Sequence, residues 1–136
     1  MTHHVTRMLE THPKDLGSID TVKLAEGIAA CFECAQTCTA CADACLGEDM
    51  VAELITCIRK NLDCADVCAA TGNVLSRQTG VNVETTRALL EACREACRVC
   101  AEECAQHAQM HEHCQVCADA CRRCETACAE LLADLG

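Results

Sequence analysis

The spacing of the cysteines constrains this chain more than any other feature of its sequence. Three long runs of cysteine contain only steps of three and four residues. Such steps follow the period of an α-helix, so the sulfurs of one run lie along one face, in the stripe where a bundle helix normally carries leucine. The runs are Cys31, Cys34, Cys38, Cys41 and Cys45, then Cys93, Cys97, Cys100 and Cys104, then Cys114, Cys117, Cys121, Cys124 and Cys128. The sequence therefore predicts helices that pack around a core of thiols.

Turn signals divide the chain into four long predicted helices, at about 18–46, 48–79, 82–109 and 112–135, with Ser18 and Asn82 as capping residues. Gly47 and Gly80 stand in two of the connections. Helices joined by such short connections run antiparallel to their neighbours. Because no segment shows the alternating pattern of a strand, we expect an all-α fold, an antiparallel up-down-up-down four-helix bundle at residues 18–136.

Residues 1–17 form a predicted N-terminal arm with a short helix. Val5, Met8 and Leu9 have the spacing of one apolar helical face, and Pro13 to Gly17 separates them from the bundle.

The second long helix carries fewer thiols than the others, at Cys57, Cys64 and Cys68. Asn61 stands where the repeat would place a further cysteine. Its amide is either a hydrogen-bonded core residue, which we favour, or a weak oxygen ligand. Gly72 in the same helix costs about 1 kcal/mol relative to alanine, and close helix packing is one reason for a glycine there.

Composition and charge exclude several classes of protein. The formal net charge of −10 argues against a nucleic-acid partner or an anionic membrane surface. The chain shows neither a signal peptide nor an apolar stretch long enough to span a membrane, so we expect a cytoplasmic protein without a membrane partner. In a reducing compartment, many cysteines indicate metal or redox chemistry, and an odd count of 17 cannot pair off in internal disulfides.

Antiparallel packing gives the predicted bundle two unlike ends. His107 and His111 continue a thiol stripe by steps of three and four, so we expect them to point inward or at the mouth of the bundle. Imidazole and thioether are metal ligands of graded softness, which favours a metal-binding mouth over a merely solvated turn. This end collects Cys45, Met50, Cys57, Asn61, His107, Met110, His111, His113 and Cys114. The other end is a predicted hydrocarbon plug that excludes water, built from Leu24, Ile28, Leu75, Leu89, Leu90, Leu131, Leu132 and Leu135.

Charge balance indicates which metal such a core holds. A tetrathiolate zinc site keeps a net charge of −2, and repeating it along a bundle would bury several uncompensated charges. Cu(I) is soft and monovalent; with bridging thiolates its ratio approaches one metal per sulfur, and the loaded core is roughly neutral. Empty, the protonated thiols pack as small hydrophobic groups. The sequence therefore favours a core that binds many Cu(I) ions, or another soft monovalent ion such as Ag(I), over one that binds Zn(II).

Two other functions remain open, a zinc or cadmium buffer of metallothionein type and a thiol redox protein. A redox protein needs an exposed thiol of low pKa rather than a buried stripe. Individual CxxC pairs are weak signals because a stripe of this spacing generates them automatically. We expect no enzyme, since neither a Ser-His-Asp arrangement nor the Glu-x-x-His pair of di-iron bundles can be identified.

Thiol runs on all four helices, a short N-terminal helix and a His/Met cluster at one mouth together resemble the bacterial copper storage proteins, in particular their cytosolic branch. The resemblance covers essentially the whole chain. It implies Cu(I) storage by the seventeen thiolates, entry at the end that bears His107, Met110, His111 and His113, and a homotetramer. A small copper chaperone as partner is likewise implied by the resemblance, and the role of Asn61 at entry is left open.

Overall fold

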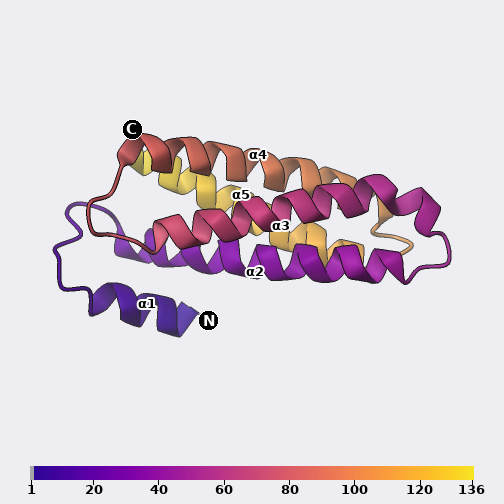
Figure 1. The fold of residues 1–136 in the computed structure, drawn as a ribbon, viewed down its shortest axis with the longest axis horizontal. Helices are drawn as coiled ribbons and strands as arrows, with labels where there is room; N and C mark the ends of the chain where they lie inside the picture. Colours follow the sequence, from indigo (N-terminus) through magenta and orange to yellow (C-terminus); the bar gives the residue numbers. More distant parts are fainter. Residues whose placement is uncertain (1) are drawn as a thin grey trace.

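Four long helices carry the thiol stripes inward in the computed structural model, which describes residues 2–136. Helices α2 to α5 lie side by side, each antiparallel to the next, and α1 lies against α2 (Figure 1). The elements are α1 Thr2–Glu10, α2 Thr21–Leu46, the 3-10 turn η1 Val51–Leu54, α3 Ile55–Leu75, α4 Val83–His107 and α5 Glu112–Leu135. The prediction of an all-α bundle with a cysteine-lined core is confirmed, and the described residues contain no strand.

The connections between the helices lie at the two ends of the bundle. The α2–α3 and α4–α5 connections lie together at one end, on the right in Figure 1. The α3–α4 connection, the link from α1 to α2 and the C-terminus lie at the other. Among residues 2–136, no helix combines the length and the apolar character needed to cross a membrane.

Capping side chains fix where two of the long helices begin. The expected N-cap Ser18 is wrong, because Asp20 takes that position and its carboxylate accepts hydrogen bonds from the backbone N–H groups of Val22 and Lys23. Asn82 caps α4 as predicted, since its side-chain oxygen accepts from the N–H of Thr85.

The second and third long helices are shorter than expected. A 3-10 turn precedes α3, which ends at Leu75 instead of Thr79. There the Ser76 hydroxyl donates to the carbonyl of Gly72 and the Gln78 amide donates to that of Leu75, so side chains satisfy the last carbonyls. Helix α4 ends at His107, two residues before its predicted end.

Two glycines mark places where helices approach closely. A Cβ on Gly72 would lie 2.9 Å from the ring of Phe32, the single aromatic residue, and a Cβ on Gly27 would lie 2.5 Å from Leu131. Close packing is therefore the reason for Gly72 inside α3, and it outweighs the lower helix propensity of glycine.

Helix α1 covers part of the bundle surface beside α2. Leu9 is buried and Val5 is half-buried, whereas Met8 is 70% exposed. Met8 lines one hollow with Val5 and Leu9, beside Ile28 and Phe32 of α2, so the three residues share a face as predicted, but the bundle leaves Met8 largely uncovered.

Candidate metal centre

The bundle core is a continuous column of thiols. All seventeen cysteines are buried and free. Because α2, α4 and α5 each present a stripe of sulfurs and α3 adds three more, the column receives thiols from all four helices.

Neighbouring sulfurs lie at distances that suit a shared metal ion. Cys34 Sγ lies 3.7 Å from the sulfurs of both Cys38 and Cys121, and Cys68 Sγ lies 3.6 Å from that of Cys97. Thiolates bound tetrahedrally at 2.3 Å from one ion stand ~3.8 Å apart, so these pairs need little rearrangement to bind metal.

The sulfurs form overlapping groups in which all ligand atoms lie within 4.8 Å of one another. Cys34 belongs to two such groups, and Cys38 and Cys124 do as well. Overlap of this kind is the geometry that bridging thiolates require. Four of the groups are Cys31, Cys93, Cys124 and Cys128; Cys34, Cys68, Cys97 and Cys124; Cys34, Cys38, Cys64 and Cys121; and Cys38, Cys100, Cys117 and Cys121.

Asn61 lies fully buried within the thiol column. Its Oδ1 accepts from the thiols of Cys100 and Cys117, both at 3.0 Å, and its Nδ2 donates to Cys57 Sγ at 3.5 Å. The expectation of a hydrogen-bonded core residue is confirmed by these contacts, and a ligand role for its oxygen stays a prediction.

One further group mixes sulfur with nitrogen at the end where α2 meets α3 and α4 meets α5. It contains Cys41, Cys45, Cys114 and His113, with all four ligand atoms within 4.8 Å of one another. Nδ1 of His113 lies 3.4 Å from Cys41 Sγ and 3.7 Å from Cys114 Sγ. This group connects the thiol column to the mouth of the bundle.

The thiols at the mouth differ in acidity. Interactions with the thiols of Cys104 and Cys117, and a contact with His113, lower the pKa of Cys41. Burial, together with the charge of Cys41, raises the pKa of Cys45 to about 11. Cys41 is thus the thiol of this pair that gives up its proton first, and a thiolate is the form that binds metal.

Glu48 holds two of the mouth histidines, a role that the sequence alone did not suggest. One carboxylate oxygen, Oε2, lies 2.9 Å from Nε2 of His113 and 3.0 Å from Nδ1 of His111. The two imidazole rings stack with their centroids 5.6 Å apart. The hydrogen bond from His113 lowers the pKa of Glu48. Burial alone would lower the pKa of His113, but its contacts with Cys41 and Glu48 outweigh burial and raise it.

A second carboxylate that the sequence reasoning missed holds the third histidine. Nε2 of His107 lies 2.9 Å from Oε2 of Glu103, and the Lys60 ammonium lies 3.5 Å from the other oxygen. Glu103 is buried although it is charged, so both partners offset the cost of removing it from water. Its position four residues before His107 on one helix is the signal that would have found the pair.

Comparisons with known proteins agree with this geometry. The family model described as copper storage protein matches residues 20–133. The chain belongs to the copper storage protein family. The structure of the copper storage protein Ccsp from Streptomyces lividans loaded with 10 copper equivalents is 59% identical and superimposes with a TM-score of 0.94, covering 95% of this chain and 98% of that one.

Two further proteins are similar to this copper storage protein. A second structure, described as copper loading to a cytosolic copper storage protein from Streptomyces lividans with five coppers, is 61% identical with a TM-score of 0.83 and covers 84% of this chain and 95% of that one. The uncharacterized cysteine-rich protein YhjQ of Bacillus subtilis is 34% identical over 106 residues, which is 78% of this chain and 93% of that protein.

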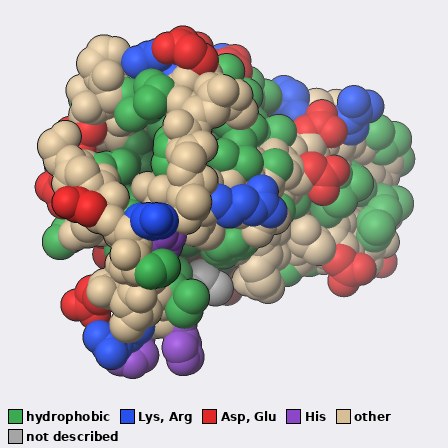
Figure 2. Space-filling model, turned by 60° about the vertical axis from the view of Figure 1, so that its left-hand side comes forward, with side chains coloured by type: hydrophobic (Ala, Val, Ile, Leu, Met, Phe, Trp, Pro, Cys, Tyr) green, Lys and Arg blue, Asp and Glu red, His purple; other side chains and the backbone are tan. Residues whose placement is uncertain are grey.

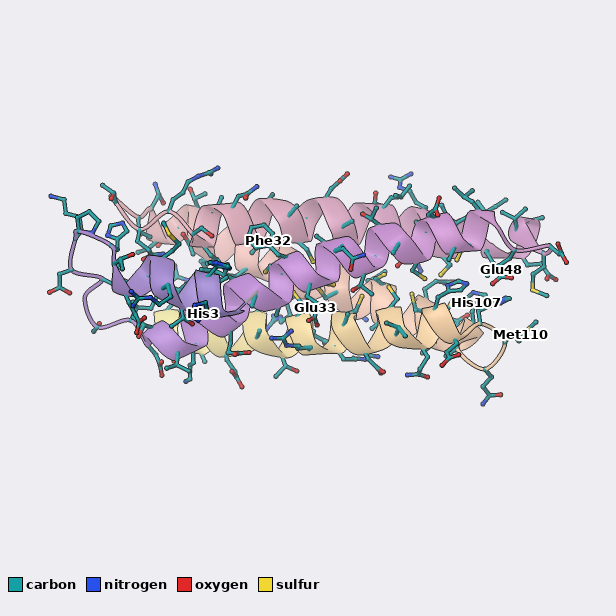
Figure 3. All side chains as sticks on the ribbon, turned by 90° about the horizontal axis from the view of Figure 1, so that it is seen from below. His3, Phe32, Glu33, Glu48, His107 and Met110 are labelled. Atoms are coloured by element: carbon teal, nitrogen blue, oxygen red, sulfur yellow. The ribbon has the colours of Figure 1, made fainter. Side chains whose placement is uncertain are left out.

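The other residues predicted to line the mouth differ in how deeply they are buried. His111 is buried and His107 is partly buried, which agrees with their positions on the thiol stripe. Glu48 and His107 lie at the same end of the bundle, and Met110 lies at the outer tip of the α4–α5 turn (Figure 3). Met110 is 64% exposed and Met50 is half-buried. The structure therefore places imidazoles, rather than thioethers, next to the first thiols.

The opposite end of the bundle is built of leucine, but it is less completely packed than the plug that the sequence predicts. Leu24, Leu75, Leu90 and Leu131, one from each long helix, are buried. Leu89, Leu132 and Leu135 are only partly buried, which corrects their assignment to the plug interior. A cavity of about 510 Å³ opens beside the leucine layer, under Leu16 and Ile19 of the link before α2. Figure 2, turned toward this end, shows hydrophobic side chains at the surface among scattered charged ones.

Proposed function

We propose that this protein stores many Cu(I) ions as thiolate-bridged copper inside the bundle. The observation that carries the proposal is the column of seventeen buried, free thiols whose metal-holding groups overlap through shared sulfurs. A soft monovalent ion suits soft thiolates, and shared sulfurs allow each ion to find its ligands without further chain movement.

The charge of the loaded core supports copper over zinc. The buried residues of the described chain include no lysine or arginine, and Lys60 at the mouth already pairs with Glu103. Zinc tetrathiolates along the column would therefore leave buried negative charge without a counterion. One Cu(I) for each thiolate leaves the core roughly neutral.

The burial of every cysteine argues against the redox alternative. Thiol–disulfide exchange requires an accessible thiolate that attacks a disulfide of another molecule. All seventeen thiols lie inside the bundle, so an attacking thiolate of this kind is missing among the described residues.

Copper enters, in this proposal, at the end that bears His107, His111 and His113, and it passes inward by ligand exchange. His113 supports this direction because its Nδ1 contacts two thiols of the column. The exposed thioether of Met110 offers an outer soft ligand at the same end. The seventeen cysteines with His113 are the proposed ligands, with His107, His111, Met110 and Asn61 as entry or auxiliary residues.

We further propose that the protein works in the cytoplasm without catalysing a reaction, and that it assembles as a homotetramer supplied by a small copper chaperone. The described relative with five coppers is called cytosolic. Exposed aliphatic side chains on the bundle surface, including Leu46, Ile55 and Val116, supply apolar area for contacts between copies. Residues 1–17 act in this proposal as an arm attached to the storage bundle at 18–136.

Titration of the reduced apoprotein with Cu(I), followed to saturation by native mass spectrometry, tests the proposed function. We expect roughly one copper per thiolate, which is ~17 ions per chain. Parallel titration with Zn(II) separates the alternatives, because a metallothionein-type buffer saturates near about four divalent ions. Saturation at one or two coppers would contradict storage in the thiol column, and the same spectra give the number of chains in the assembly.

A further inference from the structure

We propose that Glu48 is a positioning residue that holds His111 and His113 in opposite tautomers, so that a chosen ring nitrogen of each is left free for copper. The part of this inference that concerns copper rests on the proposed function, whereas the part that concerns the tautomers can be tested on the metal-free protein. A single carboxylate oxygen contacts both rings, through Nε2 of His113 and Nδ1 of His111.

The contacts of His113 determine which of its ring nitrogens carries the hydrogen. An ionised carboxylate only accepts hydrogen bonds, so the ring nitrogen 2.9 Å from Glu48 carries the hydrogen, and this nitrogen is Nε2. In the neutral ring, Nδ1 then keeps its lone pair. This nitrogen lies 3.4 Å from the sulfur of Cys41 and 3.7 Å from that of Cys114, at the end of the thiol column nearest the mouth.

The contacts of His111 give the opposite result. Its Nδ1 makes an ion-pair contact of 3.0 Å with the same oxygen. An unprotonated ring nitrogen would face that carboxylate oxygen lone pair to lone pair, so we assign the hydrogen to Nδ1 and the lone pair to Nε2. His111 is only 9% exposed, and Nε2 is the one buried side-chain nitrogen or oxygen without a hydrogen-bond partner among the described residues. A buried acceptor without a partner is costly, and that cost ends when the nitrogen gains a ligand.

The position of Glu48 in the fold explains how it reaches both rings. It follows the C-cap of α2, and its backbone N–H donates to the carbonyl of Cys45. His111 is the N-cap of α5 and His113 lies in its first turn. Through its contacts with them, Glu48, labelled in Figure 3, joins the α2–α3 connection to the start of α5. His107 has a separate carboxylate partner, Glu103.

A carboxylate behind a metal-binding imidazole orients the ring and makes its free nitrogen more basic. Loss of such a partner typically costs 10- to 100-fold in metal affinity. Glu48 therefore raises the affinity of the mouth for the first copper, while it leaves the capacity of the thiol column unchanged.

The tautomers can be read directly in reduced, metal-free protein labelled with ¹⁵N-histidine, at about pH 9 where imidazoles are neutral. We expect NMR to show hydrogen on Nδ1 of His111 and on Nε2 of His113. In Glu48→Ala both rings should lose this preference, and in the matched control Glu53→Ala, which removes an exposed carboxylate of the adjacent η1 turn, both should keep it. Circular dichroism of each variant checks that the bundle is intact.

Binding of the first Cu(I) equivalent against a competing chelator completes the test. Glu48→Ala should bind it about tenfold more weakly than the parent and Glu53→Ala, with unchanged total capacity. Tautomers that are the same in Glu48→Ala and the parent would overturn the inference. Altered tautomers with unchanged affinity would overturn its copper part, whereas a parent that binds no Cu(I) would refute the proposed function and leave the tautomer result to stand by itself.

Discussion

The two ends of the bundle are made by the same four helices and have opposite chemistry. At the mouth, carboxylates and imidazoles pair with each other beside the thiols, as Glu48 does with His113. At the other end, each helix contributes one leucine to a layer without a thiol or imidazole. In the proposed function the thiol stripe sets the capacity for copper, and the unlike residues at its two ends set the direction of loading.

The two ends also differ in how they hold the fold together. Full burial of a leucine side chain stabilises a protein by about 1.5–3 kcal/mol, and a cysteine or alanine contributes less. The pair of Glu48 with His113 at the mouth is partly exposed, and such pairs contribute little to stability. We therefore expect the leucine end to contribute more than the mouth to the stability of the metal-free fold.

The largest expected effect comes from opening the leucine layer. Leu131→Ala should lower the free energy of unfolding of the reduced apoprotein by about 2–5 kcal/mol, because Leu131 is buried and packs against Gly27. Urea denaturation followed by circular dichroism measures it. Leu62→Ala, at a 45% exposed position, is the control, with a change of about 0.5 kcal/mol or less. Equal losses in the two variants would break the assignment of stability to the leucine end.

Variants at the mouth should change the rate of copper loading rather than the stability of the fold. Replacing His107 and His111 together by Ala should slow early Cu(I) uptake and release about tenfold while final stoichiometry hardly changes, because most ligands remain. Stopped-flow loading from a Cu(I) donor measures the rates. The matched control is His3→Ala with His4→Ala, which removes two exposed imidazoles from α1. Equal rates in the two double variants, or a large loss of capacity, would show that copper enters elsewhere.

A single thiol in the middle of the bundle should matter only to capacity. Cys38→Ser should lower saturation by about one copper, since each thiolate supplies about one negative charge. Ala42→Ser, which adds a hydroxyl at another buried position of α2, should leave saturation unchanged. Native mass spectrometry compares both with the parent. A capacity that also stays unchanged in Cys38→Ser and in Cys121→Ser would mean that the stripe is packing and that copper is held elsewhere.

Removal of metal should have the smallest effect on the fold. Neutral thiols pack as small hydrophobic groups, so reduced protein treated with a chelator should keep its helical circular dichroism spectrum. A largely unstructured spectrum would show that copper, and not the leucine end, holds the helices together.

The sequence by itself determined the helical bundle, its thiol core and its two unlike ends. Steps of three and four between cysteines have one structural solution, because only a helix brings such residues to one face. Asn61 could also be placed in the core from this register, since it stands at a thiol position of its helix.

Tertiary structure decided the features that depend on contacts between helices. Glu48 pairs with His111 and His113 across two connections that are far apart in the sequence, so no local sequence pattern predicts these contacts. Gly72 weakens α3 when the helix is considered alone, and only the ring of Phe32 from α2 explains it. The exposure of Met8 and Met110 was likewise settled by packing, because helical spacing gives the face of a residue and only the neighbouring helices decide whether that face is covered.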